Sequence, residues 1–278
     1  MADTAAIGDH YASDDIAGRV LAAVRAALGA DAALTPEALA PADHFHGGGL
    51  AATRDLAAML APRAGERLLD IGAGVGGPAR WIAATFGCHV TALDLTPAFC
   101  RASAVLTATL ALDARVRVVE GSALDLPFDD ASFDRAYSQN VVMNIADKAR
   151  FFAEAFRVLR PGGAFALAAV VAGPGGPPHF PVPWASGPTA SFLSTAEATR
   201  AELTAAGFEI QRFTDTTEGV GVAQNAAAAA MSGPALPALG THLIMGPRWR
   251  ELQANGVRSR VEGRVGSVEA LVLKPRPA

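Results

Sequence analysis

The most constraining feature of this chain is an acidic residue followed by closely spaced glycines, Asp70-Ile71-Gly72-Ala73-Gly74. This segment directly follows the apolar run Arg67-Leu68-Leu69, and a helical pattern begins near Gly77. Glycine adopts backbone conformations that other residues avoid, so the chain can turn tightly here and approach a ligand closely. The helix after the turn offers unpaired N–H groups at its first residues. The sequence therefore predicts a strand, a ligand-binding turn and a helix in succession.

Two classes of nucleoside-bearing cofactor are compatible with this turn. Gly72, Gly74 and Gly77 fit the G-x-G-x-x-G pattern of dinucleotide sites, and Asp94 lies at a suitable distance downstream to bind ribose hydroxyls. Asp70 discriminates between the two classes, because a carboxylate beside the turn would repel a pyrophosphate. S-adenosylmethionine has no phosphate and carries an ammonium that a nearby acid can hold. Asp70 therefore favours S-adenosylmethionine.

Strand and helix patterns alternate after Arg67, which is typical of a doubly wound α/β fold with helices on both faces of a mostly parallel sheet. We expect strands near residues 67–71, 89–93, 116–120, 133–138, 164–171, 208–214 and 267–273. We expect the intervening helices near residues 77–86, 97–112, 148–159 and 195–206. Pro161-Gly162-Gly163 predicts a sharp end to the helix at 148–159.

Residues 66–172 resemble the core of class I S-adenosylmethionine-dependent methyltransferases. The resemblance rests on the order and spacing of five segments, residues 69–74, 90–95, 121–128, 133–134 and 157–163. Within that superfamily the chain is similar to small-molecule enzymes, including the ubiquinone-pathway C-methyltransferases and the sarcosine/dimethylglycine N-methyltransferases. The resemblance implies a Rossmann-like seven-stranded sheet with an antiparallel last strand, and methyl transfer to a small organic acceptor.

The strand ends and this resemblance together give the expected cofactor contacts, since ligands bind at the carboxyl edge of such sheets. Asp94 is expected to accept the ribose hydroxyls, and Leu95 to cover one face of the adenine. Ser122 departs from the family pattern, because many relatives have an aspartate there that accepts the adenine amino hydrogen more strongly. The predicted cofactor-binding residues are Asp70, Gly72, Ala73, Gly74, Gly77, Asp94, Leu95, Thr96, Ser122, Ala123, Leu124 and Gln139.

Two segments interrupt the alternating pattern. Residues 173–188 contain many prolines and glycines, which exclude a regular helix or a central strand, and the aromatic residues Phe180 and Trp184 favour a structured lid over a flexible linker. Residues 218–265 form the second insertion. The predicted organisation is an N-terminal helical cap (1–62), a cofactor-binding core (63–217), a substrate-cap insertion (218–265) and a final core strand (266–278).

Methyl transfer from a sulfonium is an in-line displacement, so the protein mainly positions the nucleophile and excludes water. His46 is the first candidate for a base, because neighbouring glycines let it approach the site. Gln139 and Asn140 follow the fourth strand, between the expected cofactor and the acceptor, and are candidates for a catalytic role. For Asn140, a role in a turn or a helix cap is an equally good explanation. For Asn144, such a structural role is favoured. The predicted acceptor contacts are Tyr11, His46, Met143, His179, Trp184 and His242, and for each histidine a structural role is the alternative.

Composition excludes several classes of partner. The net charge is −4 and no long basic block is present, so nucleic acid is not an expected partner. The two cysteines provide no disulfide framework, and the histidines show no tight ligand spacing beyond His44-x-His46, so no metal is predicted. No apolar run is long enough to span a membrane, and the N-terminus lacks a signal pattern. A cytoplasmic protein is expected, and a homodimer is compatible with the sequence.

Three functions remain open. A methyltransferase for a small acceptor leads, with N-, C- or O-methylation undecided. A protein that binds the cofactor without catalysis, or that regulates a partner, is the second. A nicotinamide oxidoreductase is the third, although the chain lacks a recognisable Tyr-x-x-x-Lys pair. The aromatic residues of the insertions suit a prenyl, aromatic or polyketide-like acceptor, and a small amine resting on aromatic faces is the alternative.

Overall fold

A seven-stranded sheet runs through the computed structural model, which describes residues 15–217 and 236–277. The strand order is β3-β2-β1-β4-β5-β7-β6. Neighbouring strands from β3 to β5 are parallel, and β7 is antiparallel to both β5 and β6. The predicted α/β fold with an antiparallel last strand is therefore confirmed. The strands are β1 (Arg67–Ile71), β2 (His89–Asp94), β3 (Val116–Glu120), β4 (Phe133–Gln139), β5 (Leu159–Ala172), β6 (Glu209–Asp215) and β7 (Val265–Leu273).

The helices of the alternating core agree with the sequence pattern to within one residue, except at the C-terminal end of the second helix. They are α5 (Gly77–Phe86), α6 (Pro97–Thr109), α7 (Lys148–Val158) and α8 (Ala196–Ala205). The prediction for α6 was three residues too long, because Ala111 adopts a positive φ of 53° that turns the chain toward β3. The helix α7 ends at Val158, close to its predicted end, but the segment Pro161-Gly162-Gly163 does not separate it from the next strand. This segment lies within β5, because Leu159 already pairs with Phe133 and the Gly162 amide donates to the Lys274 carbonyl.

Two apolar layers pack against opposite faces of the sheet because successive strand residues point to opposite sides. Leu69 joins the layer that contains Phe151 and Phe152 of α7, whereas Leu68 joins the layer that contains Ile82 of α5. Leu56 of α4 (Gly49–Leu60) belongs to this second layer. The helix α4 therefore covers the sheet itself and is not a detached part of the N-terminal block.

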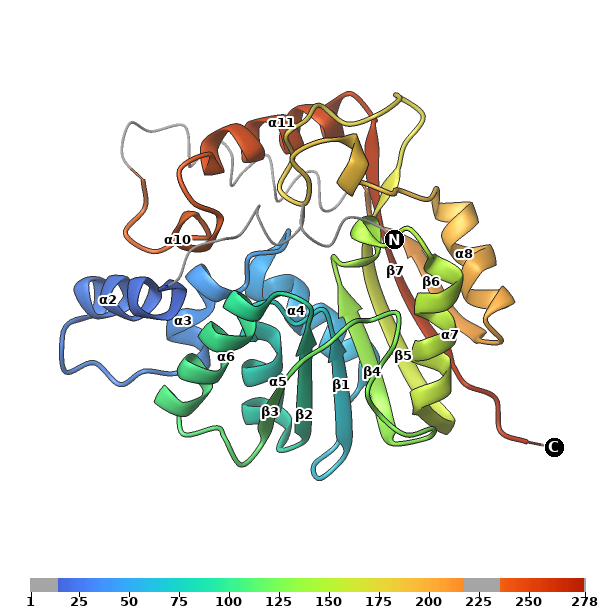
Figure 1. The fold of residues 1–278 in the computed structure, drawn as a ribbon, viewed down its shortest axis with the longest axis horizontal. Helices are drawn as coiled ribbons and strands as arrows, with labels where there is room; N and C mark the ends of the chain where they lie inside the picture. The colour runs from blue at the N-terminus through green and yellow to red at the C-terminus, as the bar shows by residue number, and fades with distance from the viewer. Residues whose placement is uncertain (1–14, 218–235, 278) are drawn as a thin grey trace.

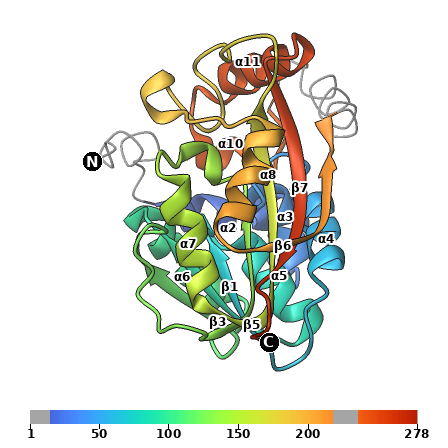
Figure 2. The ribbon, with the colours of Figure 1, turned by 90° about the vertical axis from the view of Figure 1, so that its right-hand side faces the viewer.

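A third apolar cluster joins the N-terminal helices to the insertion before β7. It contains Ile16 of α2 (Ile16–Leu28), Leu39 of α3 (Pro36–Asp43) and Ile244 of α10 (His242–Met245). The side chain of Arg19 also donates to the carbonyl of Leu243 at 3.1 Å. Figures 1 and 2 show α10 and α11 (Trp249–Val261) at the end of the sheet opposite the C-terminus of the chain. Segments far apart in sequence thus meet over the carboxyl edge.

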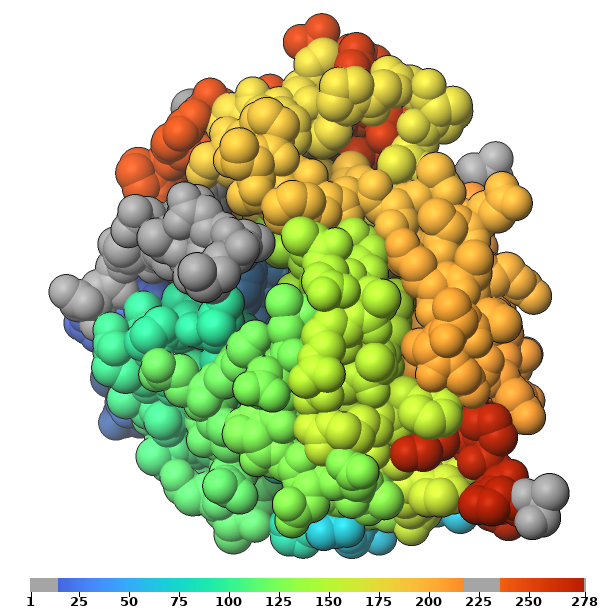
Figure 3. Space-filling model, turned by 45° about the vertical axis from the view of Figure 1, so that its right-hand side comes forward, coloured from blue at the N-terminus to red at the C-terminus, as the bar shows by residue number. Residues whose placement is uncertain are grey.

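Residues 173–192, here called the strap, connect β5 to the segment before α8. Val182 of the strap is fully buried. The Asn255 side chain donates to the Pro181 carbonyl at 2.9 Å, and the His179 amide donates to Ser259 Oγ at 2.8 Å, so the strap is tied to α11. Figure 3 shows it as a yellow band above the green region that contains α7. These contacts favour the predicted structured lid over a linker.

Across residues 15–217 and 236–277, no helix combines the length and the apolar character needed to cross a membrane.

Candidate functional site

The predicted glycine turn lies at the carboxyl end of β1. Gly72 and Gly74 have positive φ values of 85° and 56°, and the amides of Gly72 and Ala73 both donate to the Leu93 carbonyl, at 2.8 and 2.9 Å. A Cβ on Gly72 would lie 2.3 Å from Val141 Cγ2, and one on Gly74 would lie 2.6 Å from a ring carbon of Phe45. Both glycines are therefore required by conformation and by close packing.

Asp94 at the end of β2 holds this turn to the sheet. Its Oδ2 accepts the amide N–H of Gly74 at 2.8 Å, and its Oδ1 accepts the amide N–H of Thr96 at 2.8 Å. Burial raises the pKa of Asp94, although these hydrogen bonds act in the opposite direction. The Thr96 side chain and the Leu95 amide also hydrogen-bond to this carboxylate and lower its pKa. The adjacent Leu95 is 40% exposed and can cover a flat ring.

Asp70, the acid before the glycines, is almost completely buried. Its Oδ2 accepts a hydrogen bond from the Tyr137 hydroxyl at 2.9 Å. Burial raises the pKa of Asp70 to about 8, and the Asp94 charge adds to this, while the Tyr137 bond lowers it. Tyr137 was not predicted, because it becomes a neighbour of Asp70 only through the pairing of β4 with β1.

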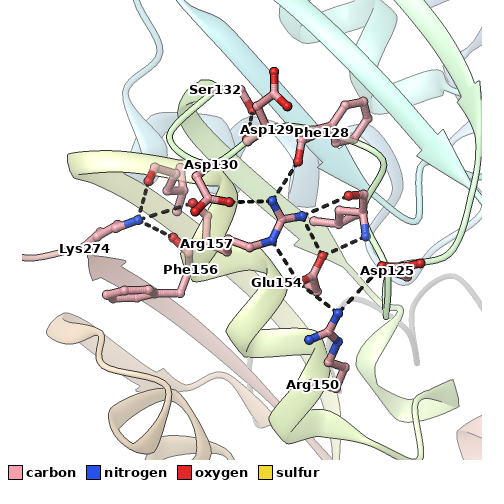
Figure 4. Close-up of polar contacts among 12 residues, drawn as sticks. Asp125, Phe128, Asp129, Asp130, Ser132, Arg150, Glu154, Phe156, Arg157 and Lys274 are labelled. Carbon is pink, nitrogen blue, oxygen red and sulfur yellow. Dashed lines mark hydrogen bonds and ion pairs between the residues drawn. The ribbon is translucent and has the colours of Figure 1, made fainter.

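The turn after β3 contains Ser122, Ala123 and Leu124. Figure 4 shows Glu154 and Arg157 of helix α7 against the segment that follows this turn, between Asp125 and Phe128. Ser122 Oγ accepts the amide N–H of Leu124 at 3.1 Å. Glu154 Oε2 accepts the amide N–H of Leu126 at 2.8 Å, and Arg157 donates to the carbonyl of Leu126 at 2.9 Å. The hydrogen bond from Arg157 holds the pKa of Glu154 below its usual value. These α7 side chains were not predicted, since their partners lie 28–31 residues away.

His46, Thr53 and Gln139 form a second polar group at the carboxyl edge. Thr53 of α4 is fully buried, and its Oγ1 lies 3.2 Å from His46 Nε2 and 3.2 Å from Gln139 Oε1. Burial, with a contribution from His44, lowers the pKa of His46 to about 4, so this imidazole is neutral near neutral pH. Gln139 Nε2 is buried and has no hydrogen-bond partner among the described residues. Thr53 was not predicted.

A buried ion pair fixes the segment that carries His46. Asp43, at the end of α3, contacts Arg80 of α5 and the His44 ring, each at 2.8 Å. Burial alone would raise the pKa of Asp43, but the His44 hydrogen bond and the Arg80 charge lower it below its usual value. A Cβ on Gly77 would lie 2.6 Å from the Asp43 carbonyl oxygen. Gly77 therefore lets α3 approach α5 closely.

The segment after β4 supplies contacts to the strap. Asn140 has a positive φ of 58°, a conformation that asparagine tolerates better than most residues. Asn144 does not cap a helix as predicted, because Asp147 caps α7; its side-chain amide instead donates to the carbonyls of Trp184 and Ala190, at 2.7 and 2.9 Å. Met143 is buried, and its carbonyl accepts the Phe192 amide N–H at 2.7 Å.

The remaining predicted acceptor residues occupy different surroundings. Trp184 donates from its ring nitrogen to Ser191 Oγ at 3.0 Å within the strap. His179 contacts Glu262 at 2.7 Å. His242 packs edge-on against Trp249, and burial lowers its pKa. Tyr11 lies outside the described residues. Within the described ranges, no group of three or more His, Cys, Asp or Glu residues could hold a metal ion.

A family model described as a methyltransferase domain matches residues 69–167. The chain is 41% identical over 98 residues to a glycine/sarcosine/dimethylglycine N-methyltransferase of Actinopolyspora halophila, an alignment that covers 35% of this chain and 17% of that protein. It is 31% identical over 176 residues to the O-methyltransferase resE of Aspergillus sclerotiorum, covering 60% of this chain and 64% of that protein. The chain thus spans less than two thirds of each relative.

Among solved structures, the crystal structure of the 4+2 cyclase SpnF superimposes with a TM-score of 0.71 and 24% identity. The superposition covers 99% of this chain and 97% of that one. At this identity the likeness establishes the fold alone, and it extends to the cap helices and the strap as well as the sheet.

Proposed function

The domain at residues 69–167 belongs to the class I S-adenosylmethionine-dependent small-molecule methyltransferases, and from this premise we propose that the chain transfers a methyl group from S-adenosylmethionine to a small organic acceptor. One observation carries the proposal. At the carboxyl edge of the sheet, a positive-φ glycine turn is closed onto the carboxylate of Asp94, which accepts the amide N–H of Gly74.

The residues at this edge fit the cofactor in chemistry. Asp94 would accept the ribose hydroxyls, and Leu95 would cover the adenine. Ser122, Ala123 and Leu124, held by α7, would meet the adenine edge, and Asp70 would lie near the ammonium. When bound, S-adenosylmethionine supplies a methyl group already activated by its sulfonium. The protein's contribution is then to hold the acceptor in line and to exclude water.

The acceptor side is proposed to lie between the carboxyl edge and the caps. Residues 1–62 and 218–265 would supply the caps. The packing of α2 and α3 against α10 supports this proposal. The helix α4 is the exception within residues 1–62, because it belongs to the core. His46 is a poor base in this arrangement, because its Nε2 faces Thr53 and its pKa is low. An acceptor that needs no base in the bond-forming step, such as a neutral amine, fits this site best.

The remaining proposals concern the whole protein. We infer a small-molecule acceptor and no nucleic-acid partner, in keeping with the net charge of −4. A homodimer and a cytoplasmic location stay predictions, which size-exclusion chromatography with light scattering and localisation of a tagged protein would test.

A second candidate is a protein that binds the cofactor and a small molecule without transferring the methyl group. The observation that favours it is the likeness to SpnF, since a structure described as a cyclase shares this fold over 99% of the chain. The two candidates differ in product. Formation of S-adenosylhomocysteine with an acceptor supports methyl transfer, whereas tight cofactor binding without it across amines, phenols and prenyl compounds supports the second candidate.

Calorimetric titration with S-adenosylhomocysteine tests the proposed site. Asp94→Ala removes the acceptor for two ribose hydroxyls, and we expect it to weaken binding at least about 100-fold. Asp134→Ala is the matched control, because Asp134 also accepts a backbone N–H, that of Arg67 at 2.6 Å, but at the opposite end of the sheet. Unchanged affinity in Asp94→Ala would refute the placement of the ribose.

A further inference from the structure

The contact between Thr53, His46 and Gln139 contains a conflict over hydrogens. The Thr53 hydroxyl lies 3.2 Å from two atoms, His46 Nε2 and Gln139 Oε1. A hydroxyl has one hydrogen to donate, so it can serve only one of them as a donor. In the other contact, the partner must donate the hydrogen and the Thr53 oxygen must accept it.

The contact between His46 and Gly47 sets the direction of this chain of hydrogen bonds. His46 Nδ1 lies 3.2 Å from the Gly47 carbonyl oxygen, which can only accept. The hydrogen of the neutral imidazole is therefore on Nδ1, and Nε2 carries a lone pair. The Thr53 hydroxyl must then donate to His46 Nε2. The Thr53 oxygen can then act only as an acceptor toward Gln139, so Gln139 must donate an N–H to it.

The amide of Gln139 satisfies this requirement when it is rotated by half a turn, which exchanges its oxygen and nitrogen. With Oε1 toward Thr53, two acceptors face each other, and Nε2 is buried without a partner. With Nε2 toward Thr53, each contact from Gly47 to Gln139 has one donor and one acceptor. The carbonyl oxygen of Gln139 then occupies the buried position that has no partner in the protein.

We propose that Thr53, together with His46, is a positioning residue that holds the Gln139 amide with its oxygen toward the cofactor site, where this oxygen accepts an N–H from the α-ammonium of the bound cofactor. The proposal rests on the proposed function. Gln139 is placed for this contact, because it ends β4 beside the glycine turn, and the preceding Ser138 donates to the Ile71 carbonyl at 2.9 Å. An ammonium has only donors, so an amide oxygen suits it and an amide nitrogen does not.

The direction of the network is tested without any ligand. In protein labelled with ¹⁵N-histidine, we expect His46 near neutral pH to show a protonated Nδ1 and an unprotonated Nε2. Thr53→Val keeps the shape of the buried side chain but removes the hydroxyl, so it should shift the Nε2 resonance. Thr199→Val is the matched control, since Thr199 is a buried threonine whose hydroxyl donates to the Thr195 carbonyl at 2.9 Å, at the start of its own helix. A hydrogen on Nε2 of wild-type His46 would overturn the proposal.

The ligand contact is tested by calorimetry on the same variants. Thr53→Val should weaken S-adenosylhomocysteine binding at least about tenfold, because a hydrogen bond to a charged group is lost. The affinity for 5′-methylthioadenosine, which lacks the amino-acid part, should not change, and Thr53→Ser should restore binding. Equal weakening for both compounds, or none for either, would overturn the proposal. If the wild type binds neither compound, the proposed function itself fails, and the histidine spectrum still reports on the network.

Discussion

The glycine-turn edge of the sheet and the strap above it are held by opposite kinds of contact. At the edge, buried or half-buried side-chain carboxylates accept main-chain N–H groups or pair with a buried arginine, as for Asp94, Glu154 and Asp43. In the strap, side-chain amides donate to main-chain carbonyls, as for Asn144 and Asn255. The ion pairs beside the strap, around Glu262, are solvent-exposed.

This difference separates two tasks. A buried charge that loses its partner strongly destabilises the fold, so the contacts at the edge fix one geometry. Neutral hydrogen bonds to carbonyls contribute less, and exposed ion pairs contribute least. We therefore expect substitutions in the strap to cost less stability than substitutions at the edge.

The largest effect is expected at Asp43. Asp43→Asn leaves the fully buried Arg80 guanidinium without its counter-charge, and we expect a loss of about 3–5 kcal/mol in the free energy of unfolding, measured with urea. Adding Arg80→Met removes the unpaired charge and should recover part of that loss. A single variant as stable as the wild type would contradict the assignment of a buried ion pair to this edge.

An intermediate effect is expected at Asn144. Asn144→Ala removes both hydrogen bonds to the strap, those to Trp184 and Ala190, at a cost of about 1–3 kcal/mol. Hydrogen exchange should become faster within residues 173–192, while affinity for S-adenosylhomocysteine stays the same. Asn255→Ala is the companion variant, because it frees the strap from α11 at Pro181 alone. Weaker cofactor binding in either variant would show that strap and edge are coupled.

The same division explains what could be predicted from the sequence. Strand and helix positions follow from local apolar patterns, and the glycine turn and Asp94 follow from their place after two such strands. Tyr137 and Thr53 could not be predicted as partners of Asp70 and Gln139, because 67 and 86 residues separate them and only the strand order and the packing of α4 bring them together. The start of β5 was predicted too late, because Pro161, Gly162 and Gly163 were expected to interrupt regular structure. The Gly162 amide instead pairs with the Lys274 carbonyl, next to the end of β7.

The smallest effect is expected at Glu262, beside the strap. Hydrogen bonds from His179, Arg264 and Arg258 lower the pKa of Glu262 to about 2. Because the folded-state pKa is depressed, any stabilisation is present above the ordinary glutamate value of about 4.3 and is lost as the pH falls toward 2. Since these partners are exposed to solvent and salt screens them, Glu262→Gln should melt close to the wild type near neutral pH, and high salt should remove the remaining difference. Thermal melts at neutral and acidic pH provide the measurement. A loss as large as that of Asp43→Asn would mean that the exposed cluster fixes the strap as firmly as the buried pair fixes the edge, and the proposed division between the two regions would fail.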